Sequence, residues 1–367
     1  MIRNAPPAPT ELEVTIFGPG IGECIVIHLG NGQWMVVDSC MSRSTDVPVA
    51  LEYLRELGVD VGNSVVRIVA THWHDDHIRG LATLLRECSK AEFVMSLALA
   101  NQQFFQLVLE VDAQNRLVTH NSSASEFAEI LGILKERARS STTAGPHTFA
   151  QDGARIFHGG FNGETEVWAL SPSAATVTNA MTALADRLLT KGSCRRFRRL
   201  SANDLSVALL VRASTYNVLL GADLENTSAS EFGWKAVLAS TGRPKDLSHL
   251  FKIPHHGSPN ADHEEVWTSM LVAEPATVVT PYAKLSGPLP RQVDIDRIKN
   301  RTSSLYCTTW PVMRKPPRRQ GVDGIIRGAT KRRRVLTTNP GHVRLRFDLG
   351  GGSPDAAINL FGSARSL

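Results

Sequence analysis

The sequence has no hydrophobic run long enough to cross a membrane, since no segment approaches the roughly 18 uninterrupted apolar residues that a spanning helix needs. Its first residues also lack the apolar stretch of a secretory signal. Cysteine is scarce, with five in 367 residues, and an odd number at irregular spacing argues against a disulfide framework. We therefore expect a protein of the reducing cytoplasm that has no membrane segment.

Basic charge is concentrated in one part of the chain. The net charge is +5, but residues 291–346 hold 15 Lys and Arg against 3 Asp and Glu, which leaves 25 basic and 32 acidic residues elsewhere. Local basicity of this kind predicts a contact surface for a polyanion. The hydrophobic fraction of 42% and the charged fraction of 20% are otherwise ordinary for a globular chain of one large domain or two.

Short apolar runs separated by glycine- and proline-containing turns predict strands that alternate with helices. Strands are expected near residues 12–17, 24–29, 33–38, 64–70, 154–158, 166–170, 206–211, 216–220, 250–253, 277–280, 304–307 and 342–348. Helices are expected near residues 46–57, 78–87, 93–111, 127–135, 176–190, 228–239 and 291–300, and residues 138–153 are expected to form a loop.

The composition divides the chain into four parts. Residues 1–10 are rich in proline and are expected to form a flexible lead-in, whereas residues 311–334 are rich in proline and arginine and show no periodicity. We predict one domain from residues 11–308 and 342–349, interrupted by a basic inserted loop at residues 309–341. Residues 350–367 are expected to form a C-terminal tail.

The segment at residues 71–77 concentrates metal-binding side chains directly after a predicted buried strand. His72 and His74 alternate, so their two imidazoles can point the same way from an extended backbone. Asp76 and His77 follow where the chain turns into a helix and can face the same space from another side. Imidazole nitrogen and carboxylate oxygen suit zinc, and also manganese or iron. The sequence therefore predicts a site for one metal ion or two.

The pattern His-x-His-x-Asp-His after a strand resembles the signature of the metallo-β-lactamase superfamily. The resemblance implies an α/β chain of α+β type, folded as a four-layer αββα sandwich, with one or two divalent ions (Zn²⁺ or Mn²⁺) as cofactor. It also implies that Asp38 orients the histidine loop, that Asp223 bridges two metals and that a late histidine pair contributes to the site. In that pair we prefer His255 as the ligand and leave His256 to bind substrate or transfer a proton. Asp76 is expected both to bind metal and to orient the nucleophile.

A second set of residues resembles the ComEC-type branch of the superfamily, the hydrolase domain that is attached to DNA-uptake channels and is also found free-standing. The segment Asn203-Asp204-Leu205-Ser206 carries this resemblance together with the Asp223 and His255 motifs. It implies that Asn203 and Ser206 lie beside the site. Many superfamily members use one more histidine before the bridging aspartate. His147 and His158 are candidates, but His158 is better interpreted as a residue at the end of a strand.

Such a site hydrolyses electrophilic centres, because a divalent ion lowers the pKa of bound water from about 15.7 toward about 7. The fold does not choose among a phosphodiester, a carboxylic ester, a lactone, a thioester and an amide. Arginine-rich runs favour a phosphodiester, since the planar guanidinium suits phosphate. The expected nucleic-acid contacts in these runs are Arg195, Arg196, Arg198, Arg199, Arg318, Arg319, Arg332, Arg333 and Arg334.

The leading hypothesis is therefore a metal-dependent nuclease or phosphodiesterase that acts on DNA or RNA through a metal-activated hydroxide. One alternative is a metallo-hydrolase of a small ester, lactone or thioester that uses the same site. Another is a nucleic-acid-binding module with a degenerate metal site. Nucleic acid is the expected partner, and the sequence leaves the oligomeric state open.

Overall fold

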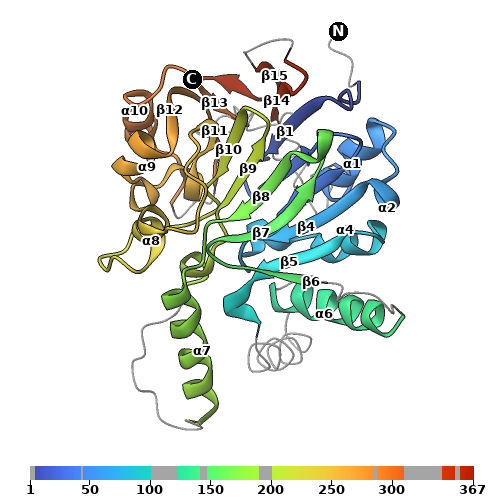
Figure 1. Cartoon of the computed structure of the whole chain (residues 1–367), viewed down its shortest axis with the longest axis vertical. Helices are drawn as coiled ribbons and strands as arrows, with labels where there is room; N and C mark the ends of the chain where they lie inside the picture. The colour runs from blue at the N-terminus through green and yellow to red at the C-terminus, as the bar shows by residue number, and fades with distance from the viewer. Residues whose placement is uncertain are drawn as a thin grey trace, which may run out of the picture.

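The computed structural model describes residues 5–42, 44–100, 123–140, 147–189, 201–283, 287–309, 341–351 and 356–367. Two eight-stranded sheets face each other, and helices cover the outer side of each sheet (Figure 1). The layers thus run helix, sheet, sheet, helix, which confirms the expected αββα sandwich. Among the helices of these described ranges, none combines the length and the hydropathy that a membrane span requires.

The first sheet has the strand order β15-β14-β1-β2-β3-β4-β5-β6. Its strands are β1 (Glu11–Phe17), β2 (Cys24–His28), β3 (Trp34–Val37), β4 (Val65–Ala70), β5 (Glu92–Ser96), β6 (His147–Ala150), β14 (His342–Asp348) and β15 (Ala357–Phe361). The strands from β15 to β3 are antiparallel, and those from β3 to β6 are parallel. Parallel neighbours need crossover connections, and the helices between these strands are α1 (Val49–Glu56), α2 (Val61–Ser64), α3 (Asp75–Ile78), α4 (Leu81–Glu87) and α6 (Ser123–Ser140).

The second sheet has the order β16-β13-β12-β11-β10-β9-β8-β7. Its strands are β7 (Ala154–Gly159), β8 (Thr165–Ala169), β9 (Leu209–Ala213), β10 (Tyr216–Leu220), β11 (Ser248–Lys252), β12 (Leu271–Val279), β13 (Leu305–Cys307) and β16 (Arg365–Ser366). The strands from β10 to β13 are parallel. Its helices are α8 (Gly233–Ala239), α9 (Glu264–Ser269) and α10 (Gln292–Lys299), whereas α7 (Ala174–Leu189) extends away from both sheets (Figure 1).

The strands place apolar side chains on both of their faces, as β1 illustrates. Leu12, Val14 and Ile16 pack between the two sheets, whereas Phe17 packs on the helix side. This alternation follows from the two-residue period of an extended chain. A third apolar cluster lies between the second sheet and the helices α8 to α10, so each pair of neighbouring layers has its own core.

Two expected elements near the end of the first sheet are wrong. Residues 92–96 form the strand β5 and do not start a helix, and residues 147–150 form the strand β6 within the expected loop. Phe93 and Met95 pack on the helix side and Val94 packs between the sheets. A strand that is buried on both faces has the same apolar composition as a buried helix, so the hydrophobic pattern alone does not separate them. The helix expected at residues 127–135 is confirmed within α6.

The expected C-terminal tail also differs from the structure. β15 pairs with β14 and extends the first sheet, and β16 pairs with β13 and extends the second. Residues 356–367 therefore belong to the sandwich. These strands are short and partly exposed, so they lack the apolar run by which the inner strands are recognised. The inserted loop expected at 309–341 lies almost wholly outside the described residues.

Candidate metal centre

The candidate ligands follow strands whose carboxyl ends meet at one edge of the sandwich. β3 and β4 are parallel neighbours in the first sheet, and β10, β11 and β12 are parallel neighbours in the second. In sheets of this kind functional residues gather beyond the carboxyl ends of the strands. Asp38 follows β3 and Asp223 follows β10, whereas the histidine cluster follows β4 and continues into α3.

Three groups of possible ligand atoms lie together at this edge. One of them, Asp38 with His72 and His77, overlaps the other two. The other two share no residue and are called the ligand groups below. His72, His74 and Asp223 form one group, and Asp76, His77 and His256 form the other, with the ligand atoms of each group within 4.8 Å of one another. In the first group, Nε2 of His72 lies 3.7 Å from Oδ2 of Asp223. In the second, Oδ2 of Asp76 lies 3.3 Å from Nε2 of His256 and 3.8 Å from Nε2 of His77.

Asp223 lies between the two groups. Its Oδ2 is 3.5 Å from Nε2 of His77 and 3.8 Å from Nε2 of His256, in addition to its approach to His72. The carboxylate therefore faces imidazoles of both groups. This is the position that the sequence resemblance gives to a residue bridging two ions.

The atoms that face the centre fit a divalent metal. Nε2 of His77, Nε2 of His256 and Oδ1 of Asp223 are buried and have no hydrogen-bond partner. Buried polar atoms without a partner are rare in folded proteins, and here they converge on one space. Imidazole nitrogen and carboxylate oxygen are the donors that Zn²⁺ and Mn²⁺ accept. These residues therefore form a candidate site for divalent metal.

The electrostatics of the site favour a bound cation. Burial holds the pKa of His72 well below its usual range and lowers that of His74, so both rings are neutral, and Nε2 of His72 lies 3.1 Å from Nδ1 of His74. Burial also lowers the pKa of His77, but the charges of Asp223 and Asp38 outweigh this and raise it well above its usual value. Burial raises the pKa of Asp223, but the charges of His77 and His256 bring it well below the ordinary value. The carboxylates of Asp223 and Asp38, which raise the pKa of His77, would also attract a metal cation.

Asp38 supports the histidine loop from behind. It is 1% exposed, and it accepts hydrogen bonds from the backbone N–H of Thr71 at 2.8 Å and from the Thr71 hydroxyl at 2.7 Å. Nδ1 of His77 donates to the same carboxylate at 2.7 Å. Since Nδ1 is engaged in this way, Nε2 of His77 is the nitrogen that is directed at Asp76 and Asp223.

The structure separates the two late histidines, and it reverses the expected roles. Nε2 of His256 faces Asp76 and Asp223, and its Nδ1 donates to the carbonyl of Thr280 at 2.9 Å. His255 belongs to neither ligand group among the described residues. In this geometry His256 is therefore a better candidate ligand than His255, which the sequence analysis preferred. Both histidines have a left-handed backbone, with φ of 44° and 53°, so the alternation of a strand does not apply to them.

His255 instead joins a partly exposed polar cluster beside the ligands. Its Nδ1 lies 3.0 Å from Oε1 of Glu225, which also accepts a hydrogen bond from Nδ2 of Asn203 at 2.7 Å. Burial lowers the pKa of His255, but the hydrogen bond with Glu225 and the charge of Asp223 raise it above its usual value. Oδ1 of Asn203 and Oγ of Ser206 are buried without a hydrogen-bond partner. Asn203 thus contacts Glu225 and His255, which follow Asp223 and precede His256 in the chain.

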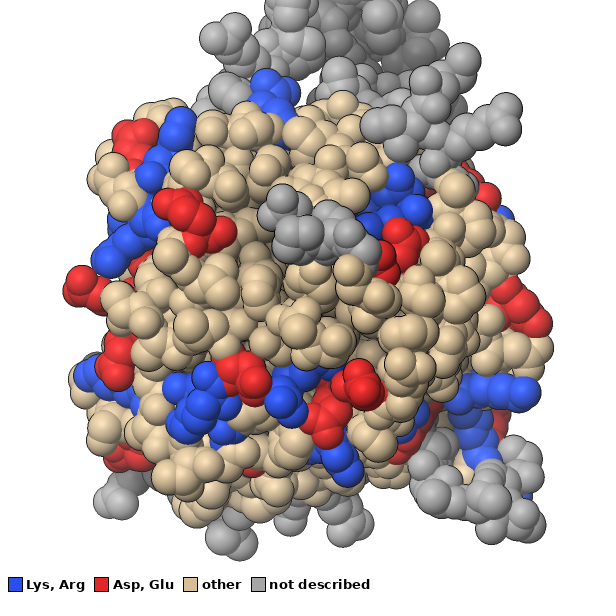
Figure 2. All heavy atoms as spheres, turned by 45° about the horizontal axis from the view of Figure 1, so that its top comes forward, with Lys and Arg blue, Asp and Glu red and all other residues tan. Residues whose placement is uncertain are grey.

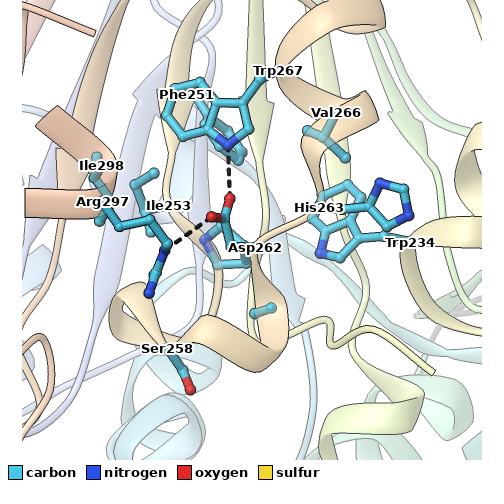
Figure 3. Close-up of a pocket in the computed structure, with 12 residues that line it drawn as sticks. Trp234, Phe251, Ile253, Ser258, Asp262, His263, Val266, Trp267, Arg297 and Ile298 are labelled. Atoms are coloured by element: carbon cyan, nitrogen blue, oxygen red, sulfur yellow. Dashed lines mark hydrogen bonds and ion pairs between the residues drawn. The ribbon is translucent and has the colours of Figure 1, made fainter. Parts of the chain in front are cut away.

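The turn that carries the late histidines, η4 (Pro254–Gly257), is held by a charged network. Arg297 of α10 donates to the carbonyl of Gly257 at 2.7 Å and pairs with Asp262 at 2.9 Å and with Asp294 at 2.8 Å. Figure 3 shows Arg297 and Trp267 both directed at Asp262, within a pocket that borders the turn at Pro254 and Ser258; its other lining residues are Trp234, Phe251, Ile253, Ala261, His263, Val266 and Ile298. None of the residues that line this pocket belongs to a ligand group.

The structure does not bring the two remaining candidate histidines to the site. His147 begins β6 and its ring lies against Phe149, and His158 is an exposed residue of β7 opposite Glu166. Neither belongs to a ligand group in the part of the chain that the structure describes.

All nine arginines expected to contact nucleic acid lie outside the described residues, in 190–200 and 310–340. On the face drawn in Figure 2, the coloured lysine and arginine side chains stand among aspartate and glutamate side chains and form no single basic area. The described part of this face therefore adds nothing to the prediction of a polyanion surface.

Three polar residues near the ligands were missed by sequence reasoning. Glu225 follows Asp223 by two positions, Lys252 ends the largely buried strand β11, and Glu23 follows a glycine-rich turn. A lysine at the end of a buried strand was the available signal, because lysine is almost never fully buried without a partner. The partner itself is far away in the sequence.

Comparison with known proteins agrees with this architecture. Residues 17–148 match the family model described as the metallo-β-lactamase superfamily, a segment that contains Asp38 and the histidine cluster but ends before Asp223 and His256. Residues 17–148 are thus similar to the metallo-β-lactamase superfamily, and the two sheets flanked by helices are the metallo-β-lactamase fold. No curated protein matches the chain.

Among the solved structures that are similar to this one, three have different descriptions. The metallo-β-lactamase fold protein YhfI from Bacillus subtilis is 10% identical, with 80% of this chain and 95% of that chain covered and a TM-score of 0.38. MEM-A1, a subclass B3 metallo-β-lactamase from a soil metagenome library, is 15% identical, with 66% and 72% covered and a TM-score of 0.31. A mutant of the β-hydroxylase CmlA is 17% identical, with 82% and 42% covered and a TM-score of 0.34.

Proposed function

We propose that this chain is a metal-dependent hydrolase that uses two divalent ions to cleave a phosphodiester bond of DNA or RNA. The observation that carries the proposal is the position of Asp223, whose Oδ2 lies within 3.8 Å of imidazole nitrogens from both ligand groups. One carboxylate shared by two sets of ligands is the arrangement expected for a pair of neighbouring ions. Members of the superfamily that the family model describes are typically metal-dependent hydrolases.

The residues of the chain supply binding and orientation in this proposal. When bound, divalent ions act as Lewis acids and lower the pKa of water, so that a nucleophile is present at neutral pH. His72 and His74 would hold one ion, and His77 and His256 the other. Burial raises the pKa of Asp76, but the close approach of Nε2 of His256 at 3.3 Å and the charge of His77 bring it below its usual range. Asp76 therefore stays ionised, and it would bind metal and orient the attacking water.

The cluster at the rim is placed to receive substrate. The side chains of His255 and Glu225 are 21% and 23% exposed, so they border both the ligands and solvent. Oδ1 of Asn203 has no hydrogen-bond partner, and its Nδ2 lies 3.5 Å from Nε2 of His255, so Asn203 offers a further polar atom on this side of the site. We assign these residues to orientation of the substrate.

The choice of a phosphodiester is supported by the chain's arginine-rich runs and by its resemblance to the ComEC-type branch. Two-ion sites suit phosphodiester cleavage, since two cations stabilise both the attacking and the leaving oxygen. The runs at residues 195–199 and 314–334 hold forked guanidinium groups suited to phosphate. Because these arginines are numerous, the affinity for a polynucleotide would fall steeply as the salt concentration rises.

Hydrolysis assays with added metal test the proposal. The wild type, His74→Ala and Asp223→Ala are compared on bis-p-nitrophenyl phosphate, labelled DNA and RNA, carboxylic esters and nitrocefin, with Mn²⁺ or Zn²⁺. The matched control is His158→Ala, which removes an exposed histidine outside both ligand groups. We expect metal-dependent cleavage of a phosphodiester by the wild type and by the control, and none by the other two variants.

The alternatives give different results in the same assays. If both ligand variants retained cleavage, the proposed centre would not take part in the reaction. Turnover of esters alone would indicate the small-substrate hydrolase, and metal binding without any turnover would indicate a binding module. Neutralising Arg332, Arg333 and Arg334 should reduce the affinity for a polynucleotide and the salt dependence of binding, whereas turnover of a small ester should not change.

A further inference from the structure

A fully buried ion pair joins the two sheets beside the candidate metal centre. Nζ of Lys252, the last residue of β11, lies 2.5 Å from Oε2 of Glu23, which directly precedes β2. The two side chains are 0% and 1% exposed. Neither residue belongs to a ligand group among the described residues. Burying two charges carries a large desolvation cost, so this pair calls for a role.

The carboxylate of Glu23 is linked to His256 through one residue. The hydroxyl of Thr280, just after β12, donates to Oε2 of Glu23 at 2.5 Å. The carbonyl of the same threonine accepts the hydrogen bond from Nδ1 of His256 at 2.9 Å. Thr280 is 0% exposed, so it has little freedom to move. The ion pair therefore fixes the residue that orients the His256 ring.

The backbone of Glu23 is linked to a second candidate ligand. Its N–H donates to the carbonyl of Asp76 at 2.9 Å. The chain can come this close because Gly22 precedes Glu23. Gly22 has φ of +95°, and a Cβ added there would lie 2.6 Å from Cβ of Cys40 and 3.2 Å from the Asp76 carbonyl. Glu23 thus contacts the turn that carries Asp76 and, through Thr280, the ring of His256.

Lys252 holds the other side of the arrangement. It lies two residues before Pro254, where the turn carrying His256 begins. Its carbonyl also accepts a hydrogen bond from the N–H of Gly221 at 3.2 Å, in the segment that leads to Asp223. The ion pair therefore joins the loop before β2 in the first sheet to the segments of the second sheet that deliver His256 and Asp223.

We propose that the Glu23–Lys252 pair is a positioning device for one of the two metal ions, the ion held by Asp76, His77 and His256. This inference rests on the proposed two-ion function. It adds that the buried pair supports the binding of one ion and not of the other. The other ion's histidines have a different support, because Nδ1 of His72 contacts the hydroxyl of Thr71 at 3.0 Å and not the ion pair. Loss of the pair should therefore weaken the binding of this ion and leave the binding of the other ion unchanged.

A double variant separates positioning from stability. Replacing both partners of a buried ion pair with apolar residues of similar volume is often neutral for folding, whereas removing one partner is strongly destabilising. Glu23→Met combined with Lys252→Met is therefore expected to fold but to leave the Thr280 hydroxyl without its acceptor. Thr280→Val is a second, milder variant, since it keeps the carbonyl that binds His256 and removes the hydroxyl, which donates to Glu23 at 2.5 Å and has a longer contact of 3.5 Å with Nδ1 of His256.

The test measures the two stepwise Zn²⁺ affinities of the full chain by competition with a chromophoric chelator, together with the visible spectrum of bound Co²⁺. We expect both variants to bind one of the two ions, the one held by Asp76, His77 and His256, roughly 10- to 100-fold less tightly, as is typical when residues supporting a metal ligand are changed. The affinity for the other ion should stay within about twofold of the wild type. Glu13→Gln is the control, because Glu13 is 0% exposed and pairs with Arg346, away from the candidate ligands.

The outcomes distinguish this inference from the proposed function. A wild type that binds two ions, with variants whose two affinities are both unchanged or both lowered equally, overturns the positioning role and leaves the two-ion hydrolase standing. A wild type that binds fewer than two ions overturns the two-ion centre and the selectivity with it. A lower affinity for one ion in the double variant and in Thr280→Val, with Glu13→Gln unchanged, supports the inference.

Discussion

Replacing Asp38 with asparagine would show how the candidate centre keeps His77 ready to bind metal. Asp38 accepts the Thr71 N–H on Oδ1, and it accepts the Thr71 hydroxyl and Nδ1 of His77 on Oδ2. Asparagine keeps one oxygen and replaces the other with a donor. The backbone N–H of Thr71 can only donate, so the oxygen stays on that side and the amide nitrogen faces His77.

An amide N–H facing Nδ1 favours the tautomer of His77 that carries its proton on Nε2. That nitrogen is the one directed at Asp76 and Asp223, at 3.8 and 3.5 Å, so the proton has to leave before a metal can bind there. The lost hydrogen bond involves a charged group and contributes about 1.5–3 kcal/mol. At about 1.4 kcal/mol for each tenfold change, the affinity for metal should fall roughly 10- to 100-fold, as for other residues that support metal ligands.

The measurement is the apparent Zn²⁺ affinity at neutral pH, by competition with a chelator, for the wild type, Asp38→Asn and Glu13→Gln. Glu13 is also a fully buried carboxylate, but it accepts hydrogen bonds from Tyr53 and Arg346. Only Asp38→Asn should lose affinity. If Asp38→Asn bound Zn²⁺ within about twofold of the wild type, His77 would not depend on Asp38 and the argument from tautomers would be refuted.

Two further predictions concern the turn that carries the late histidines. Arg297→Met removes the hydrogen bond to the Gly257 carbonyl and should lower the free energy of unfolding by about 2–3 kcal/mol in denaturant titrations. Arg301→Met, whose contact with the largely exposed Glu264 is 3.6 Å long, should change it by less than about 1 kcal/mol, and equal losses in both variants would contradict the assigned role. His255→Gly should be more stable than His255→Ala by about 0.5–1 kcal/mol, because the left-handed backbone costs a residue with a Cβ roughly 1–2 kcal/mol and glycine loses part of that difference in entropy. Equal unfolding midpoints would show that the backbone at His255 is not strained.

The four-layer fold and the first part of the site could be predicted because their signals are local. An apolar strand followed by alternating His72 and His74, and then by Asp76 and His77 at a helix start, places four donors within reach of one another without any distant contact. The order of the later motifs added Asp223 through the resemblance. Short-range periodicity encodes such features, since side-chain direction within a strand or a helix turn follows from backbone geometry.

Other features depend on contacts that the sequence pattern does not contain. β5 has the apolar run of a buried helix, and only its hydrogen bonds to β4 and β6 make it a strand. The final short strands, β15 and β16, exist because β14 and β13 offer them free edges.

Within the site, the chain alone indicated which side chains can bind a cation, because that property belongs to each residue and its near neighbours. It did not indicate whether His255 or His256 does so. The direction of each ring depends on the left-handed backbone of these two residues and on the hydrogen bond from Arg297 to the Gly257 carbonyl. Nor did it pair Glu23 with Lys252, which lie on different sheets. Long-range packing brings these groups together, and only the folded sandwich defines their distances.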